Sequence, residues 1–187
     1  MLKVRNLGLG EVVEITPARF GDARGFFQES WSRRAFADAG YDLDFVQDNH
    51  SYSASRGVLR GLHYQTPPFA QDKLLRVTRG SVFDVAVDIR RGSKDFGRWV
   101  GVVLSADAGN QVLVPRGYAH GFVTLEEHTE VQYKVTAPYD PRYDRAIRFD
   151  DPSIGVAWPS MGDALILSDK DRRAPSLADA DLEHDWS

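Results

Sequence analysis

One stretch of the sequence spaces glycine, proline and histidine in a way that could build a site around a histidine. Gly109 is followed by five residues and then by Pro115-Arg-Gly117-Tyr-Ala-His120. Histidine acts as a general base near neutral pH and is also a common metal ligand. The chain has no cysteine, which excludes thiolate metal sites, disulfides and a cysteine nucleophile. His120 is therefore a candidate for a metal site or for a hydrogen-bonding role.

The same stretch resembles the second sequence motif of the cupin jelly rolls, in which the histidine points into the mouth of the barrel. In metal-binding cupins, a His-x-His and a glutamate from the first motif complete the ligand set. Here Lys73 stands seven residues before Gly80, where the pattern has the glutamate, and no histidine lies between Thr66 and Phe69. A lysine cation cannot bind a metal. We therefore expect no metal and no other cofactor, with His120 as a hydrogen-bonding group that lines the barrel.

Seven separate strings extend the resemblance to one cupin family, the deoxythymidine-diphosphate-4-dehydrorhamnose 3,5-epimerases, from about Ile15 to Pro175. The strings are Asp22-Ala-Arg-Gly-Phe-Phe-Gln-Glu29, Gln47-Asp-Asn-His-Ser-Tyr-Ser53, Gly57-Val-Leu-Arg-Gly-Leu-His-Tyr-Gln65, Gly80-Ser-Val-Phe-Asp-Val-Ala-Val-Asp88, Ala119-His-Gly-Phe122, Tyr133-Lys134 and Ser168-Asp-Lys-Asp171. The resemblance implies an isomerase that inverts C3 and C5 of dTDP-4-dehydro-6-deoxy-D-glucose through enolate intermediates. Its product would be dTDP-4-dehydro-L-rhamnose, for dTDP-L-rhamnose and cell-surface polysaccharide biosynthesis.

Epimerisation beside a ketone needs a group that removes a proton, a group that stabilises the enolate oxygen, and a proton donor on the opposite face. The resemblance implies His63 as the base, Asp171 as the carboxylate that fixes its tautomer, and Tyr133 as the proton donor. Lys73 fits as the cation at the enolate oxygen, where it supplies the charge that a metal supplies in other cupins. Without the resemblance, His63, Asp171 and Tyr133 would be an ordinary structural histidine, a solvated charge and a strand aromatic.

Substrate binding is the role that the resemblance implies for the remaining polar matches. Arg24 and Arg60 suit a diphosphate, which a chain of net charge −4 must meet with local cations. The other matching positions are Glu29, Gln47, Asp48, Asn49, Lys73, His120, Asp144 and Lys170. Asp144 stands where the family commonly has glutamate, so a direct contact there could become water-mediated.

The elements that must position these residues are mainly strands, because short segments rich in Val, Phe, Tyr and Thr alternate with Gly, Pro and Asp. A short helix is expected from its cap Ser32 to Ala39, with Gly40 as its stop, and another helix could lie near the end. The predicted strands are 12–15, 25–31, 44–50, 57–64, 73–79, 81–89, 98–105, 111–114, 119–125 and 129–136. We therefore predict an all-β cupin jelly roll with short flanking helices.

Segment 81–89 alternates with the period of a half-buried strand. Its expected core face carries Phe83, Val85, Val87 and Ile89, and its other face carries Val82, Asp84, Ala86 and Asp88.

Length and charge set the broad class. At 187 residues the chain fits a single domain, 1–187, with an acidic tail at 175–187 that is either docked or frayed. The negative charge disfavours nucleic acid, and the lack of an apolar leader or membrane-length stretch predicts a soluble, cytoplasmic protein without a membrane partner. The resemblance also implies a homodimer, in which residues near Arg24 to Glu29 reach into the neighbour's barrel.

Three alternatives remain at this point. The first is a related enzyme that inverts only C3 or C5 of a dTDP-4-keto-6-deoxyhexose, with Tyr139 near the region that would influence the outcome. The second is a non-catalytic sugar-nucleotide-binding cupin, against which the presence of His63 and Tyr133 argues. The third is a metal-dependent oxygenase cupin, which the missing first-motif ligands oppose.

Overall fold

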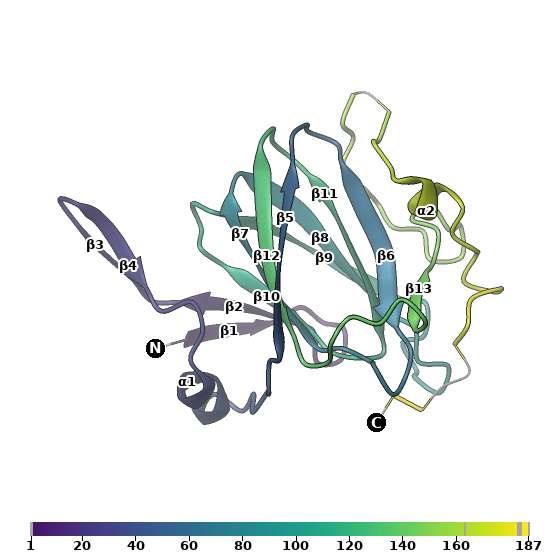
Figure 1. Cartoon of the computed structure of the whole chain (residues 1–187), viewed down its shortest axis with the longest axis horizontal. Coiled ribbons are helices and arrows are strands. Elements are labelled where there is room, and N and C mark those ends of the chain that lie inside the picture. The colour runs from purple at the N-terminus through teal and green to yellow at the C-terminus, as the bar shows by residue number, and fades with distance from the viewer. Residues whose placement is uncertain (1, 163, 183–184, 187) are drawn as a thin grey trace.

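Two antiparallel sheets face each other in the computed structural model, which describes residues 2–162, 164–182 and 185–186 (Figure 1). The first sheet has the order β1 (Leu2–Asn6), β2 (Val13–Pro17), β10 (Gln111–Val114), β7 (Lys73–Arg79), β12 (Thr129–Val135) and β5 (Gln47–Ser53). The second sheet has the order β13 (Asp144–Ala146), β6 (Leu59–Gln65), β11 (Tyr118–Thr124), β8 (Ser81–Asp88) and β9 (Trp99–Ser105). The prediction of an all-β jelly roll is confirmed.

The main core lies between the sheets. Leu75 and Val77 of β7 pack there with Val82 and Ala86 of β8 and with Phe122 of β11. Alternation places every second side chain of a strand on this inner face. The inner face therefore provides the walls of a barrel whose polar positions can hold a site.

Strand β8 is buried on both faces, so the prediction of a half-buried strand is wrong. Val82 and Ala86 belong to the core between the sheets, while Val85 and Val87 belong to a second cluster on the outer side of the second sheet. The C-terminal segment supplies Leu177, Ala180, Leu182 and Trp186 to that second cluster. The tail is thus docked without forming a helix in its described residues, and this cover explains why apolar residues lie on both faces of β8.

The N-terminal region forms a hairpin that extends away from the barrel (Figure 1). Its strands are β3 (Arg19–Asp22), which was not predicted, and β4 (Gly25–Gln28), which is shorter than the predicted strand 25–31. The predicted helix follows as α1 (Arg33–Asp38), and Ser32 caps it by accepting a hydrogen bond from the Ala35 N–H at 3.4 Å. Phe36 anchors this helix against the outer face of the first sheet.

Two short elements bring the far end of the chain to β6. Strand β13 pairs with β6, and α2 (Asp169–Arg172) begins after its cap Ser168 and contacts the same strand. None of the helices among the described residues is long and apolar enough to cross a membrane. β6 is therefore the strand on which residues distant in sequence converge.

Candidate active site

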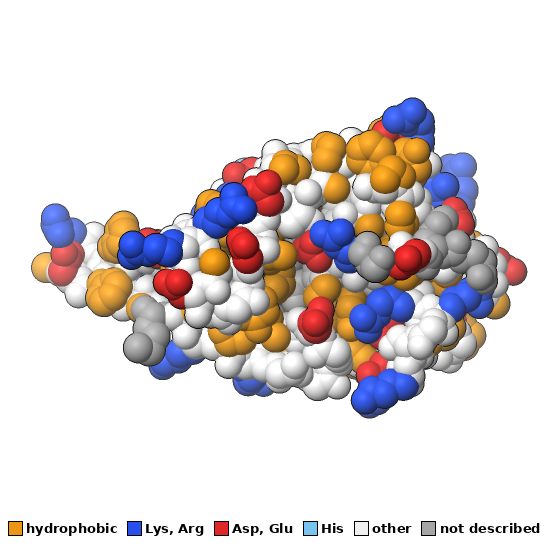
Figure 2. Space-filling model, turned by 90° about the horizontal axis from the view of Figure 1, so that it is seen from below, with side chains coloured by type: hydrophobic (Ala, Val, Ile, Leu, Met, Phe, Trp, Pro, Cys, Tyr) orange, Lys and Arg blue, Asp and Glu red, His pale blue; other side chains and the backbone are white. Residues whose placement is uncertain are grey.

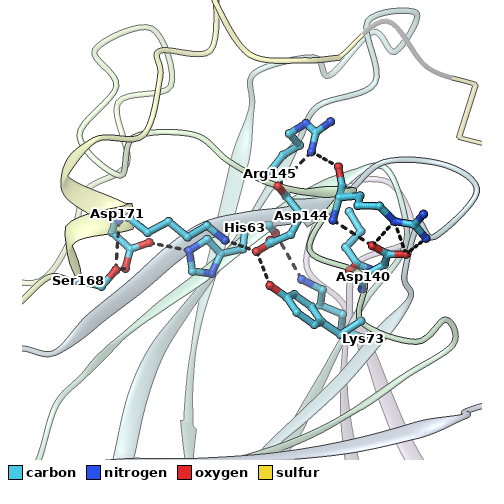
Figure 3. A network of polar contacts seen from close by, with 11 residues as sticks. His63, Lys73, Asp140, Asp144, Arg145, Ser168 and Asp171 are labelled. Atoms are coloured by element: carbon cyan, nitrogen blue, oxygen red, sulfur yellow. Dashed lines mark hydrogen bonds and ion pairs between the residues drawn. The ribbon is translucent and has the colours of Figure 1, made fainter.

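His63 and Asp171 form a hydrogen-bonded pair across 108 positions of sequence. Nε2 of His63 lies 2.6 Å from Oδ1 of Asp171, which α2 holds almost fully buried (Figure 3). Oδ2 of the same carboxylate accepts a hydrogen bond from Oγ of Ser168 at 2.7 Å. Both oxygens of Asp171 are thus fixed, so the carboxylate can hold the imidazole in one orientation.

The pKa shifts of this pair favour a neutral imidazole beside an ionised carboxylate. Burial lowers the pKa of His63 and outweighs the opposing effect of Asp171, and the nearby Lys170 and Lys73 lower it further. Burial acts to raise the pKa of Asp171, but hydrogen bonds from His63 and Ser168 hold it below its ordinary value. At neutral pH, His63 is then ready to accept a proton.

Two glycines bring β6 and β11 close together beside the pair. A Cβ at Gly61 would lie 2.5 Å from Cα of Gly121 and 2.8 Å from the carbonyl oxygen of His120, and Gly61 also has φ of +131°. Only glycine fits such a position. The close approach accompanies the register in which His63 and His120 are directly opposite each other on the two strands.

Lys73 begins β7 and points into the barrel. Its side chain is buried, and Nζ donates a hydrogen bond to the carbonyl oxygen of His63 at 3.3 Å (Figure 3). Burial lowers the pKa of Lys73 to about 8, while the carboxylates of Asp144 and Asp84 act in the opposite direction. The ammonium group is therefore a desolvated cation next to the candidate base, where its charge acts strongly on any anion that forms.

Tyr133 of β12, in the same sheet as Lys73, faces the cavity from the side opposite the sheet that carries His63. Burial raises the pKa of its phenol, and Arg60 counteracts the rise. The cavity has a volume of about 590 Å³, enough for a sugar nucleotide fragment. Ten of the predicted site residues line it: Gln47, Asn49, Arg60, His63, Lys73, His120, Tyr133, Asp144, Lys170 and Asp171.

His120 makes the hydrogen-bonding contact expected of it. Its Nε2 lies 3.0 and 2.9 Å from the two carboxylate oxygens of Asp84, and both side chains are buried. Within the described part of the chain, no group of three or more His, Cys, Asp or Glu side chains is arranged to hold a metal ion. The same cavity is lined by the side-chain cation Lys73.

One edge of the cavity is closed by a polar network around Asp144 (Figure 3). Lys170 and the Tyr139 hydroxyl, the latter at 3.1 Å, both donate to Oδ2 of Asp144. The side chain of Gln47 accepts from the backbone N–H of Tyr139 at 3.0 Å. Although it is one methylene shorter than glutamate, Asp144 thus reaches both of its protein partners directly.

Arg60 lines the cavity and has a side-chain donor without a hydrogen-bond partner. Nη2 donates to the carbonyl oxygen of Tyr52 at 3.2 Å, but its Nε is buried and has no hydrogen-bond partner. The Oγ atom of Ser51, which lines the same cavity, is also buried and unpartnered. Buried polar atoms without partners are costly unless a ligand or water completes them.

Three predicted binding residues lie outside this cavity. Arg24 is exposed at the end of the hairpin, where it pairs with Asp22 at 2.5 Å, and Glu29 is exposed just after β4. On β5, alternation turns Gln47 and Asn49 inward. The same alternation turns Asp48 outward to Lys134, which donates to it at 2.8 Å. A single chain therefore does not bring Arg24, Glu29 and Asp48 to the other site residues.

Asp84 and Ser168 are site residues that the sequence analysis did not single out. The signal for Asp84 was a carboxylate between Val82 and Ala86 on one face of an apolar strand. Ser168 stands three residues before Asp171, as a helix cap does. Its Oγ accepts a hydrogen bond from the backbone N–H of Asp171 at 3.2 Å. The local sequence pattern could therefore have singled out Asp84 and Ser168. It could not have shown which side chains they contact in the folded chain.

Comparison with known proteins gives a consistent result. The family model described as dTDP-4-dehydrorhamnose 3,5-epimerase matches residues 6–179. A protein of that description from Pseudomonas aeruginosa is 52% identical over 96% of this chain and 98% of its own length.

Two solved structures are similar to the whole fold. A 3,5-epimerase from Legionella pneumophila in complex with dTDP-4-keto-L-rhamnose has a TM-score of 0.91 and 44% identity, covering 95% of this chain and 94% of that chain. A 3'-monoepimerase from Streptomyces bikiniensis in complex with dTDP-quinovose has a TM-score of 0.86 and 34% identity. The match covers 93% of this chain and 87% of that chain.

Proposed function

Because this chain belongs to the dTDP-4-dehydrorhamnose 3,5-epimerase family, and is therefore an isomerase, we propose that it inverts both C3 and C5 of dTDP-4-dehydro-6-deoxy-D-glucose. The product is dTDP-4-dehydro-L-rhamnose, for dTDP-L-rhamnose and cell-surface polysaccharide biosynthesis in the cytoplasm. The observation that carries the proposal is one cavity in which a carboxylate-backed histidine from the second sheet meets a buried lysine and a tyrosine from the first sheet.

The first step assigns proton removal to His63. Its neutral imidazole takes the proton from the carbon beside the C4 ketone, and the electron pair of that C–H bond moves to the ketone oxygen to form an enolate. Asp171 then stabilises the imidazolium without taking the proton itself. The ammonium of Lys73 stabilises the new oxyanion in a site where water does not screen its charge.

The second step assigns proton delivery to Tyr133. Its hydroxyl protonates the flattened carbon from the face opposite His63, the enolate electrons return to the carbon, and the ketone reforms. Solvent then restores the proton to the tyrosinate and removes the one on His63. Because Tyr133 comes from the first sheet and His63 from the second, the two groups border the cavity from different sides.

Turnover in heavy water tests the number of inverted carbons. We expect wild-type enzyme to convert dTDP-4-dehydro-6-deoxy-D-glucose in D₂O into product with deuterium at both C3 and C5, because each inversion exchanges one proton with solvent. Proton NMR of the product counts the labelled carbons. The likeness to a 3'-monoepimerase makes label at C3 alone the competing outcome, and label at neither carbon contradicts epimerase activity altogether.

We propose that the reaction needs no metal. Lys73 supplies positive charge where a metal ion would otherwise do so. Enzyme dialysed against EDTA is expected to keep at least about nine-tenths of its kcat, with elemental analysis showing no stoichiometric transition metal. Loss of activity on chelation, restored by Zn²⁺, Fe²⁺ or Mn²⁺, would show that the enolate is stabilised differently.

We propose a homodimer in which the hairpin of one chain completes the other chain's site. Phe20, Phe26 and Phe27 of the hairpin are 65%, 61% and 69% exposed. Figure 2 shows hydrophobic side chains on this narrow extension of the molecule. Exposed aromatics are commonly covered by a partner. A second chain would also explain why Arg24 and Glu29 lie away from the cavity of their own chain.

Mixed dimers test this arrangement. His63→Ala and Arg24→Glu are each expected to lower kcat/KM by at least about 100-fold as homodimers. Co-expression with two different tags isolates the heterodimer, which carries one site with an intact His63 and an intact partner arginine. This heterodimer is expected to recover up to half of the wild-type kcat/KM. No recovery, or a catalytically competent monomer in light scattering, contradicts the crossed arrangement.

A further inference from the structure

Asp84 is a carboxylate at the inner wall of the barrel, behind the proposed catalytic groups. It is 1% exposed on β8, between Val82 and Ala86, which belong to the apolar core. Both of its oxygens lie within 3.0 Å of Nε2 of His120. An ionised carboxylate in such surroundings is costly to the fold unless it is paired, which makes its position there informative.

His120 and Lys73 are the two groups on which this carboxylate acts. An imidazole whose Nε2–H points at a carboxylate presents its other ring nitrogen, Nδ1, for a ligand. The ring of His120 lines the same cavity as Lys73, and the charge of Asp84 favours the protonated form of that lysine. Burial raises the pKa of Asp84, and both His120 and Lys73 oppose the rise.

We infer that Asp84 is a positioning residue for the epimerisation: its carboxylate fixes the orientation and tautomer of His120 and places a negative charge near the ammonium of Lys73. It touches neither substrate nor reacting atoms, and it acts through the two groups that do. The inference rests on the proposed function. It gives the site two histidine–carboxylate pairs with different tasks, His63–Asp171 for proton transfer and His120–Asp84 for holding the polar end of the cavity.

Several charged groups besides Asp84 act on Lys73, and they bear on any pH effect. The carboxylate of Asp144 on β13 raises its pKa, and the ammonium of Lys170 on α2 lowers it. The remaining titratable groups that line the same cavity are Arg60, His63 and Tyr64 on β6, His120 on β11, Tyr133 on β12, Tyr139 before β13 and Asp171 on α2. A substitution at position 84 acts directly on His120, the hydrogen-bond partner of Asp84, and on Lys73, which feels its charge.

The pH profile of Asp84→Asn tests the charge separately from the shape. Asparagine keeps an acceptor for Nε2–H of His120 but removes the negative charge, so the alkaline limb of the kcat/KM profile is expected to move to lower pH by roughly one unit. The control is Asp88→Asn, which removes another buried carboxylate from the same face of β8. Asp88 pairs with Arg90 and Ser93 rather than with the site, so its limb is expected to stay in place.

Histidine NMR tests the same inference on the unmodified protein and does not depend on the variant folding. In ¹⁵N-labelled wild type, we expect Nε2 of His120 to be protonated across the neutral range. A bare Nε2 would mean that Asp84 holds the proton and carries no charge, which overturns the inference. The inference is also overturned if the alkaline limb of the kcat/KM profile stays in place in Asp84→Asn, or if it moves equally in Asp88→Asn. Failure of wild-type turnover would instead count against the proposed function, and the NMR result would still stand.

Discussion

Replacing His63 by alanine is expected to lower kcat by about 10²–10⁴-fold, the usual cost of removing a general base. Exchange of the C3 and C5 protons with D₂O should fall by the same factor, since no group then removes either proton. Nucleotide binding should change little, because Arg60 and the pair Asp144 and Lys170 at the edge of the cavity are unaltered. The measurements are kcat, proton exchange by NMR, and the Kd for dTDP by calorimetry.

Tyr133→Phe is the matched comparison for this loss. It removes one hydroxyl from the opposite sheet and leaves the His63–Asp171 pair intact. The base can still remove a proton and return a solvent-derived one to the same face, so exchange should continue while inversion falls. If His63→Ala kept near wild-type exchange, another group would be the base. If Tyr133→Phe lost exchange and inversion equally, Tyr133 would mainly position the sugar.

The sequence was most informative where a strand is followed directly by a turn residue, as at Gly80 and Pro115. Strands 73–79 and 111–114 were predicted with the bounds that β7 and β10 have. β1 and β13 were missed because β1 is largely exposed at the edge of its sheet and β13 spans only three residues. β13 exists because Asp144–Ala146 pairs with β6, which is a tertiary contact rather than a local preference.

Ten residues that the sequence analysis singled out line the cavity, but the sequence could not predict their geometry. His63 and Asp171 were linked only through the family strings, because nothing local connects residues 108 positions apart. Asp84 was placed on a solvent-side face by its alternation, since the sequence could not show that the C-terminal segment covers the other side of β8. The hairpin residues Arg24 and Glu29 remain predictions that need a second chain.

The pKa of Lys73 links the stability of the fold to the chemistry. A folded-state pKa of about 8, against an ordinary value of 10.5, means that the charged side chain destabilises the fold by about 3 kcal/mol below pH 8. This cost is relieved as the pH rises from 8 to 10.5, because the folded protein loses the proton before the unfolded chain does. Catalysis has the opposite dependence, since the ammonium that stabilises the enolate is lost above pH 8.

Lys73→Met should therefore separate activity from stability. Methionine fills a similar volume without a charge, so the variant is expected to be at least as thermostable as wild type near pH 7, even though Asp84 loses a nearby cation. Its kcat should fall by roughly 10²–10³-fold, the usual cost of removing one stabilising contact to an oxyanion. The alkaline limb that Lys73 gives the wild-type pH profile should disappear at the same time.

The control is Lys170→Met, which lies in the same cavity and should raise KM more than it lowers kcat. Melting temperature, kcat, KM and their pH profiles are the measurements. A Lys73→Met enzyme with normal kcat and a raised KM would make Lys73 a binding residue, and the enolate would need another source of positive charge.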